Sequence, residues 1–392
     1  MTPAVRREIR KLQQQHSPFC AYLYDLTALR ERIADMKHRL PTGCELFYAT
    51  KANGEAPILR TLAPWVDGFE AASGGELAWL AQQSLDSKLL FGGPGKLTSE
   101  LVLACELKVD ALHVESLGEL QRLAMLAEQR RQVLPLLLRM NIPLPGGTDT
   151  PLMMAGRPTP FGLDTTDLAA ALRLIADCRW LRLRGFHFHL LSHQLSVDNH
   201  LALIQHCLTQ VGQWCRQFQL SIEMVNLGGG FGINYRDPSH HFDWDDFCQR
   251  LPAVRHACQA TSWLLRFECG RYISAPCGYY DYVMEVLDIK RNLGEWFAIG
   301  HGGTHHFRTP VAQGHDHPFQ VVRRETPAQI RDQRVTLVGQ LCTPKDVLAR
   351  RQPISALAPG DWLVFPLAGA YTWNISHRHF LMHAAPHTVW LA

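Results

Sequence analysis

Residues 68–93, "GFEAASGGELAWLAQQSLDSKLLFGG", contain one complete unit of the fold and the start of the next. The run "GFEAAS" has the short apolar character of a buried strand, and "LLFGG" repeats it at the end of the stretch. Between them, "GGELAWLAQQS" places apolar residues three and four apart, as on an amphipathic helix. The stretch therefore predicts a strand, a helix and a second strand, which is the repeating unit of α/β proteins.

Eight short apolar or β-branched runs of this kind occur before Arg271. They lie in segments that begin at Cys44, Gly68, Leu89, Ala111, Leu134, Leu183, Glu223 and Leu265. The early runs alternate with helical patterns and recur about every 20–25 residues, the short period expected of a parallel barrel. We therefore predict an α/β fold with a (β/α)8 barrel, also called a TIM barrel, and an open doubly wound sheet is the alternative.

The pattern changes after Arg271. Strong helical periodicity fades, and segments such as "GYYDYVMEVLDIKR" and "GDWLVFPLAGAYTW" combine β-branched and aromatic residues with Gly and Pro. Such segments are typical of a second, β-rich domain. We expect residues 1–25 to be a lead-in that contributes to the β-rich domain, residues 26–272 to form the barrel, and residues 273–392 to form the C-terminal domain.

Composition narrows the classes of function. The 392 residues are 46% hydrophobic, and the formal net charge is only +3. No run of Lys and Arg alternates with aromatic residues, so we expect no nucleic-acid partner. The N-terminal segment lacks the apolar core of a signal peptide, and no segment has the length and hydropathy of a membrane span. The eleven cysteines form no CxxC pair, which favours a reducing cytoplasm.

Glycine loops follow the last two runs. Barrel enzymes carry their chemistry at the carboxyl ends of the strands, and the loops after strands seven and eight commonly hold phosphate. Here the seventh run ends with Gly228, Gly229 and Gly230, and the eighth ends with Gly270 and Arg271. Glycine lets backbone N–H groups approach phosphate oxygens because it has no Cβ atom. An isolated GGG is more often a tight turn, but its place after strand seven favours a phosphate site.

The other strand ends supply reactive side chains. Lys51 follows the first run, where an ammonium is costly unless it is exposed, paired or chemically bound. The remaining strand-end residues are Glu70, Arg139, His187, His189, Ser192 and Glu268. A lysine, an imidazole, a carboxylate and a phosphate site at one barrel mouth point to pyridoxal 5'-phosphate, which uses all four groups.

Three of these residues leave alternatives open. Glu70 either orients Lys51 or the cofactor ring, or is a solvated loop carboxylate. His187 and His189 lie two residues apart on one strand, and we expect one of them to face the barrel interior and the other the helices.

Several longer motifs occur in a fixed order from Phe47 to Tyr371. They are "FYATKAN", "FEAASGGEL", "HVESLGEL", "HFHLLS", "LGGGFG", "ECGRY", "GQLCTPKDVL" and "GDWLVFPLAGAY". With them the chain resembles the barrel-type (fold type III) pyridoxal-phosphate decarboxylases, which include the ornithine and diaminopimelate decarboxylases. The resemblance implies an alanine-racemase-like barrel, a C-terminal β domain, and a head-to-tail homodimer whose active sites lie at the interface.

The resemblance also implies roles for single residues. Lys51 would form the Schiff base with the cofactor, His189 would stack on its ring, and Glu268 would pair with the pyridine nitrogen. The residues facing the phosphate would be Ser192, Gly228, Gly229, Gly230, Gly270, Arg271 and Tyr371. We also place Glu70 and Arg139 among the cofactor-binding residues. His187 then becomes a residue of the core or of the layer behind the site.

Cys342, in "GQLCTPKD", would be the general acid that is supplied across the dimer interface and protonates the substrate after CO2 has left. Taken alone it could be a small buried hydrophobic residue. A non-catalytic relative that regulates a partner and a racemase of the same barrel class are further alternatives. The joint presence of Lys51, Glu268 and Cys342 favours a decarboxylase, because the racemases have an arginine opposite the pyridine nitrogen.

Histidine-rich runs raise a metal hypothesis. The 20 histidines include the runs "HFHLLSH" and "GHGGTHHF". No HExxH motif is present, and the adjacent His305 and His306 cannot readily point at one ion from a regular strand. We therefore expect no catalytic metal.

Departures from the family pattern bear on the substrate. In the amine-forming decarboxylases the residue after the catalytic cysteine is usually acidic and holds a distal ammonium. Here it is Thr343, which cannot balance a buried charge. We include Thr343 and Asp346 of the "CTPKD" run among the substrate-binding residues.

Basic residues replace another family motif. Where the relatives have a "GGMND"-like run, this chain has "GGTHHFRTP", with His305, His306 and Arg308. Together with Arg157 these side chains could hold carboxylates. The combination resembles the decarboxylases of carboxylate-type siderophore assembly, which act on a citrate-bearing amino acid such as citryl-diaminopropionate. Diaminopimelate or another basic amino acid is the alternative substrate.

Overall fold

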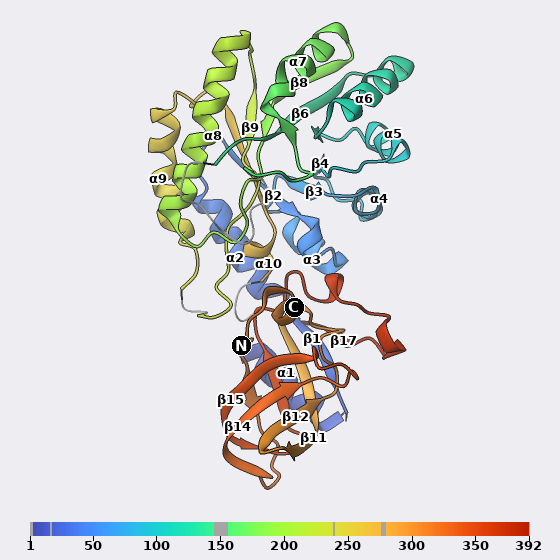
Figure 1. The fold of residues 1–392 in the computed structure, drawn as a ribbon, viewed down its shortest axis with the longest axis vertical. Helices are drawn as coiled ribbons and strands as arrows, with labels where there is room; N and C mark the ends of the chain where they lie inside the picture. The colour runs from blue at the N-terminus through green and yellow to red at the C-terminus, as the bar shows by residue number, and fades with distance from the viewer. Residues whose placement is uncertain (1–2, 16–17, 145–155, 238–239, 276–279, 392) are drawn as a thin grey trace. The chain divides into compact units, whose positions relative to one another are not determined.

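The structure is a computed structural model that describes residues 3–15, 18–144, 156–237, 240–275 and 280–391. The chain divides into two compact units. The barrel unit consists of Arg32–Gly232 and His241–Gly270. The β unit consists of Met1–Glu31, Ile233–His240 and Arg271–Ala392. Figure 1 shows the elements of both units.

Eight parallel strands close into a ring in the barrel unit, because β5 pairs with β6 and β10 pairs with β2. The strands are β2 (Cys44–Ala49), β3 (Gly68–Ala71), β4 (Lys88–Phe91), β5 (Ala111–Val114), β6 (Leu134–Asn141), β8 (Leu181–His187), β9 (Met224–Asn226) and β10 (Leu264–Cys269). The short β7 (Leu163–Asp164) adds to the edge of β6. The predicted closed barrel is confirmed, and each of the eight predicted runs overlaps one of these strands.

Helices lie around the outside of this ring of strands (Figure 1). They are α2 (Leu26–Arg39), α3 (Ala56–Leu62), α4 (Gly74–Gln82), α5 (Thr98–Glu106), α6 (Leu117–Arg130), α7 (Leu168–Asp177), α8 (Val197–Phe218) and α9 (Trp244–Ala257), with the single turns η1 (Thr50–Ala52) and η2 (Thr165–Asp167). Ser73 and Ser116 start two of them, since each hydroxyl accepts a hydrogen bond from the backbone N–H three residues later. Such caps end the strand segment and fix where the helix begins.

The β unit is built on a curled mixed sheet. Its strands run in the order β13 (Gln320–Val322), β16 (Trp362–Phe365), β11 (Tyr280–Asn292), β12 (Glu295–Gly300), β14 (Ile330–Val338) and β15 (Val347–Leu357), and β1 (Cys20–Asp25) pairs with both β11 and β17 (His387–Leu391). The helical segments are α1 (Pro3–Gln15), α10 (Arg271–Ser274), α11 (Thr309–Gln313), η3 (Trp373–Ile375) and η4 (Phe380–Met382). The separate β-rich part expected from the sequence is therefore present.

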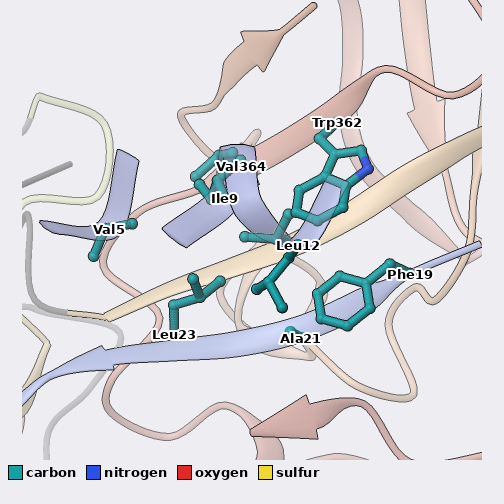
Figure 2. Packing of buried hydrophobic residues seen from close by; sticks show 9 residues of the cluster. Val5, Ile9, Leu12, Phe19, Ala21, Leu23, Trp362 and Val364 are labelled. Atoms are coloured by element: carbon teal, nitrogen blue, oxygen red, sulfur yellow. The ribbon is translucent and has the colours of Figure 1, made fainter. Parts of the chain in front are cut away.

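The N-terminal helix packs on this sheet. Figure 2 shows apolar side chains from α1, β1 and β16 in one cluster. On the helix they recur four and three residues apart, and on β1 they alternate, which gives each element one apolar face. The Phe19 and Trp362 rings stack with centroids 5.1 Å apart. The labelled members are Val5, Ile9, Leu12, Phe19, Ala21, Leu23, Trp362 and Val364. No helix in the described part of the chain is long and apolar enough to cross a membrane.

A buried carboxylate in the β unit predicts an unusual pH dependence of stability. Asp281 is 0% exposed, and neither of its oxygens has a hydrogen-bond partner among the described residues. Burial, with a smaller contribution from the nearby Asp25, raises the pKa of Asp281 to about 7. The folded state therefore binds a proton that the unfolded state releases at lower pH. Stability should fall as the pH rises from about 4 to 7.

We expect Asp281→Asn to stabilise the protein by about 2 kcal/mol at pH 8, because it removes the buried charge. The gain should shrink as the pH is lowered toward 4, where the wild-type carboxyl is neutral in the folded state. Urea unfolding midpoints of both proteins between pH 4 and 8 measure this. Asp288→Asn, at an exposed position of the same strand, is the control. A gain that is equal at every pH would contradict the prediction.

Candidate active site

Lys51 lies directly after β2, in the turn η1. Its Nζ atom is 3.0 Å from Oε2 of Glu70, a buried residue of β3, and the lysine side chain itself is 39% exposed. Burial raises the pKa of the Glu70 carboxyl, the Lys51 ammonium opposes this, and Glu268 adds to it. The lysine is thus paired with a carboxylate at the carboxyl end of the barrel, where a small molecule can reach it.

Glu268, on β10, is surrounded by polar side chains from neighbouring parts of the barrel. Its Oε1 accepts a hydrogen bond of 2.7 Å from Nδ2 of Asn226, at the end of β9. Nε2 of His187 lies 3.5 Å from Oε2, and Nδ1 of His113 lies 3.7 Å from Oε1. All four residues are buried. The barrel therefore holds this carboxylate in one orientation, and the bond from Asn226 leaves Oε2 for another donor.

The position of His187 corrects one expectation. Its ring stacks on that of His113, with centroids 4.1 Å apart and planes at 12°, so it points into the barrel. Residues two apart on a strand point to the same side, and the idea that His187 and His189 face opposite sides is wrong. Burial lowers the pKa of His113 and of His187 well below the usual value; His187 adds to the shift of His113, and the positive charge of Arg139 adds to that of His187. Both imidazoles are therefore neutral.

His189 lies just beyond β8, against the glycine loop. The Gly229 N–H donates to Nδ1 of His189 at 3.3 Å, which leaves the ring proton on Nε2. A Cβ atom on Gly228 would lie 2.8 Å from the same Nδ1, and one on Gly229 would collide with the carbonyl oxygen of Glu268. Gly228 and Gly230 also have φ of +64° and +96°. The loop thus needs glycine at each position, which brings its backbone close to the imidazole.

Arg139, on β6, forms a buried ion pair that the sequence did not reveal. Its Nη1 lies 2.7 Å from Oε1 of Glu115, and its guanidinium carbon lies 5.1 Å from the centre of the Phe161 ring. Glu115 also accepts hydrogen bonds from the backbone N–H groups of Gly93 and Gly162. Arg139 is therefore held by Glu115, which is itself bound by the loops after β4 and before β7. Ser192, half-buried, follows His189 by three residues.

In the β unit, Arg271 lies between two tyrosines. Nη1 donates a hydrogen bond of 2.7 Å to the Tyr235 hydroxyl, and the guanidinium carbon is 4.4 Å from the centre of the Tyr371 ring. Tyr371 has φ of +53°, a left-handed conformation that is rare for such a residue. The Thr309 hydroxyl helps to hold it there by donating to the Tyr371 carbonyl at 2.8 Å. Strain of this kind concentrates at functional sites.

Cys342 is exposed, in the loop between β14 and β15. Asp346, in the same loop, is buried. Its Oδ1 accepts from the backbone N–H and the hydroxyl of Thr304 at 2.7 and 2.8 Å, and its Oδ2 accepts from the Leu341 N–H at 2.8 Å. Asp346 thus joins the cysteine loop to the loop that carries His305. The predicted substrate contact of Asp346, and that of its half-buried neighbour Thr343, stay predictions.

His305 and His306 lie together in the β unit with ring centroids 3.9 Å apart. The His306 nitrogens have partners, since Nε2 is 2.9 Å from the Ala384 carbonyl and Nδ1 is 3.1 Å from the Tyr282 hydroxyl. His305 is 0% exposed, and neither ring nitrogen has a hydrogen-bond partner in the described part of the chain. Arg308 in the β unit and Arg157 in the barrel unit are exposed.

Within the described ranges, one group of side chains has the spacing of a metal site. Candidate ligand atoms of His113, His187 and Glu268 lie within 4.8 Å of one another. These atoms belong to the residues that surround the carboxylate proposed for the pyridine nitrogen, so an ion would compete with a cofactor ring for Glu268. The expectation of a site without metal stays a prediction.

Sequence reasoning missed His113 and Asn226, the neighbours of Glu268. Both occupy strand ends, in "ALHVES" and "EMVNLGGG", just as Glu70 and Glu268 do. Their position at the ends of predicted barrel strands was therefore a usable signal. Glu115, the partner of Arg139, directly follows β5 in the run "ALHVES", so its position carried the same signal.

Comparison with known proteins agrees with this geometry. Residues 26–275 match the family model for the pyridoxal-binding domain of pyridoxal-dependent decarboxylases. The chain is 41% identical to the 2-[(L-alanin-3-ylcarbamoyl)methyl]-2-hydroxybutanedioate decarboxylase of Staphylococcus aureus, over 99% of this chain and 98% of that protein. It is 29% identical to the L-glutamyl-[BtrI acyl-carrier protein] decarboxylase of Niallia circulans, over 94% and 87%.

A solved structure shows the same fold. The crystal structure of diaminopimelate decarboxylase from Helicobacter pylori, complexed with L-lysine, superposes with a TM-score of 0.87. The match covers 98% of this chain and 94% of that one, at 22% sequence identity.

The side chains at the barrel mouth fit pyridoxal phosphate. An accessible amine stands at Lys51, an imidazole whose pKa is lowered by burial stands at His189, and a buried carboxylate oriented by Asn226 stands at Glu268. A Cβ atom on Gly228, Gly229 or Gly230 would lie 2.3–2.7 Å from a backbone carbonyl oxygen, so only glycine lets this loop pack at the end of β9, where the family resemblance places the phosphate of the cofactor. With this donor set and the match over residues 26–275, the chain belongs to the pyridoxal-dependent decarboxylases and uses pyridoxal phosphate as its cofactor.

Proposed function

We propose that this decarboxylase acts on a citrate-bearing amino acid, the amide of citrate with the side-chain amine of 2,3-diaminopropionate, in the assembly of a carboxylate siderophore. The identity of 41% to the S. aureus enzyme, over nearly the full length of both chains, carries the proposal, because that enzyme is named for this compound. The relatives named diaminopimelate decarboxylases are 24–29% identical. The neutral Thr343 supports the same choice, since it cannot balance a distal ammonium.

Residues of the barrel unit bind and orient the reacting groups in this proposal. Pyridoxal phosphate, when bound, supplies an electron sink for the electron pair that remains as CO2 departs. Lys51 would hold the cofactor through its amine, His189 would cover the ring, and Glu268 would pair with the pyridine nitrogen. Glu70 orients Lys51, as their 3.0 Å contact supports. Arg139 completes this set on the strength of its fixed position on β6.

In this proposal the cofactor's phosphate group is bound by one serine, four glycines, one arginine and one tyrosine. The N–H groups of Gly228 and Gly229 already donate to Oδ1 of Asn226 and Nδ1 of His189, respectively. The loop would therefore donate to the phosphate mainly through the Gly230 N–H, and Arg271 would supply the positive charge. The strained Tyr371 lies against Arg271 and limits its freedom. The proposed set is Ser192, Gly228, Gly229, Gly230, Gly270, Arg271 and Tyr371.

The proton that replaces the lost carboxyl group comes from Cys342 in this proposal. Its thiol is exposed, and Asp346 holds the loop that carries it. Substrate carboxylates are assigned to His305, Arg308 and Arg157, with Thr343 beside the cysteine. His306 is the weaker candidate of the two adjacent histidines because both of its ring nitrogens are already hydrogen bonded.

We further propose that two chains form a head-to-tail homodimer, so that one chain lends Cys342 to the other's Lys51. The exposure of Cys342 within its own chain supports this. We place the protein in the cytoplasm. The ten cysteines of the described residues are all free thiols, which suits a reducing compartment.

A substrate screen with the holoenzyme tests the proposal. Release of CO2 is measured with citryl-diaminopropionate, diaminopimelate, ornithine and lysine. We expect kcat/KM for the citryl compound to exceed that for the other three by at least about a hundredfold, because unpaired buried charges are rejected strongly. A preference for diaminopimelate or a diamine precursor would refute the substrate. Cofactor binding without CO2 release from any compound would indicate a regulator instead.

The Thr343→Asp variant sharpens the screen. A carboxylate at this position should repel the citryl arm and attract a distal ammonium, so kcat/KM should fall for the citryl compound and rise for lysine or ornithine. Thr326→Asp, at an exposed position of the same unit, is the matched control. If Thr343→Asp and Thr326→Asp change kcat/KM equally for every substrate, then Thr343 does not contribute to substrate recognition.

A further inference from the structure

Gln340, two residues before Cys342, joins three segments of the β unit. Its Oε1 accepts a hydrogen bond of 2.7 Å from the Gly302 N–H and lies 3.1 Å from Nδ1 of His301. Its Nε2 lies 2.8 Å from Nδ1 of His383, in the segment after η4. The cysteine loop, the loop after β12 and the C-terminal segment are therefore linked through one carboxamide.

These contacts fix the proton on His383. A backbone N–H can only donate, so the atom facing Gly302 must be the oxygen of Gln340, and the amide nitrogen must face His383. That nitrogen donates to Nδ1 of His383. In a neutral imidazole the other nitrogen then carries the hydrogen. His383, which is half-buried, thus offers an N–H donor at Nε2.

The neighbours of His383 are imidazoles. The ring of His305 lies 5.0 Å away, centroid to centroid, and its two nitrogens lack hydrogen-bond partners in the described part of the chain. The titratable groups that act on His305 are His301, His306, His377 and His383, and those that act on His301 include Glu285 and His387. Glu285 already accepts a hydrogen bond from the Phe19 N–H. Each neutral imidazole offers one N–H donor, so the cluster presents several N–H groups together with Glu285 as the one carboxylate named beside them.

We propose that His383, with its tautomer set by Gln340, is a specificity-determining residue that donates a hydrogen bond from Nε2 to a carboxylate of the substrate's citrate arm. This inference rests on the proposed function, which places the neighbouring Cys342 at the substrate. Two features carry it: an oriented donor in the cysteine loop's own hydrogen-bond network, and a buried ring beside it whose polar atoms lack partners. A carboxylate is the ligand that accepts from several N–H groups at once.

A pair of substrates isolates the carboxylate contact. Citryl-diaminopropionate and N3-acetyl-2,3-diaminopropionate share the amino acid head and the amide, and only the first carries the citrate carboxylates. With the holoenzyme, His383→Phe should lower kcat/KM for the citryl compound by about tenfold or more, since a hydrogen bond to a charged group is lost. The value for the acetyl compound should stay the same. A structural role for His383 would lower both together.

Two further variants keep the test decisive. His383→Gln retains a donor on a planar side chain and should restore most of the discrimination between the two substrates. Gln340→Met removes the donor to Nδ1, and it should reduce discrimination even where His383→Phe fails to fold. His379→Phe, at an exposed position of the same segment, is the control and should change neither substrate. Unchanged discrimination in both His383→Phe and Gln340→Met would overturn the inference.

A measurement of citrate affinity tests the inference about His383 independently of the proposed function. If the wild-type holoenzyme releases CO2 from neither compound, the proposed function fails, and titration calorimetry with citrate decides the inference. Citrate affinity that is at least tenfold weaker in His383→Phe than in the wild type would support a carboxylate site at this position. Equal affinity in the two proteins, or no citrate binding by either, would refute it.

Discussion

Replacing Lys51 with alanine is expected to lower turnover at least about a thousandfold, because the amine that bonds the cofactor aldehyde is the nucleophile on which substrate exchange depends. The visible absorbance of the bound cofactor should be lost as well. The structure adds a second consequence. Glu70 is buried and 3.0 Å from Nζ, so the alanine variant leaves a buried carboxyl without its partner. The pKa of Glu70, already raised by burial, should rise further.

The Lys51→Arg variant separates charge from covalent chemistry. Arginine can keep the ion pair with Glu70 but cannot bond an aldehyde as the lysine amine does. We expect it to retain thermal stability and to lose both turnover and the cofactor absorbance. Absorbance spectra, CO2 release and thermal melting of both variants measure these effects. Lys290→Ala, at an exposed position of β11, is the control. Wild-type absorbance and turnover in Lys51→Ala would contradict the assignment.

The barrel could be predicted because its signal is local. Each strand is buried on both faces and is followed by a helix with one apolar face, so strand and helix patterns alternate along the sequence. The order of the β unit could not be predicted in this way. Its strand β1 pairs in parallel with β17, at the opposite end of the chain, and with β11 on its other side. Such pairings depend on contacts between distant segments, which no local pattern records.

The active site likewise has a part that could be predicted from local patterns and a part that could not. Lys51, Glu70 and Glu268 could be predicted to meet because the carboxyl ends of parallel strands share one rim of the barrel. The contacts that orient these groups, such as the hydrogen bond from Asn226 to Glu268, depend on how side chains from different strands meet inside the ring. A linear sequence does not contain that geometry. The error over His187 was different, since the two-residue period of a strand was sufficient to avoid it.

Replacing Cys342 with alanine is expected to lower kcat by about a hundred- to a thousandfold, the range that a general acid contributes, while cofactor binding stays unchanged. The structure gives the reason for this selectivity. Cys342 is exposed in a loop of the β unit, and the carboxylate of Asp346 in that loop accepts hydrogen bonds from the N–H groups of Thr304 and Leu341. Removing one sulfur atom disturbs none of these hydrogen bonds. The fold and the cofactor absorbance should therefore survive.

Single-turnover kinetics assign the loss to proton delivery rather than to CO2 release. With Cys342→Ala, the first equivalent of CO2 should appear at close to the wild-type rate, because the departing carboxylate needs no proton, and the amine product should lag behind it. Cys178→Ala, at a half-buried position of the barrel unit, is the control and should show no lag. Equal slowing of CO2 and amine would instead place Cys342 in substrate binding. Wild-type kinetics in Cys342→Ala would show that Cys342 is not an active-site residue. The proposal that a second chain completes the catalytic centre would then lose its support.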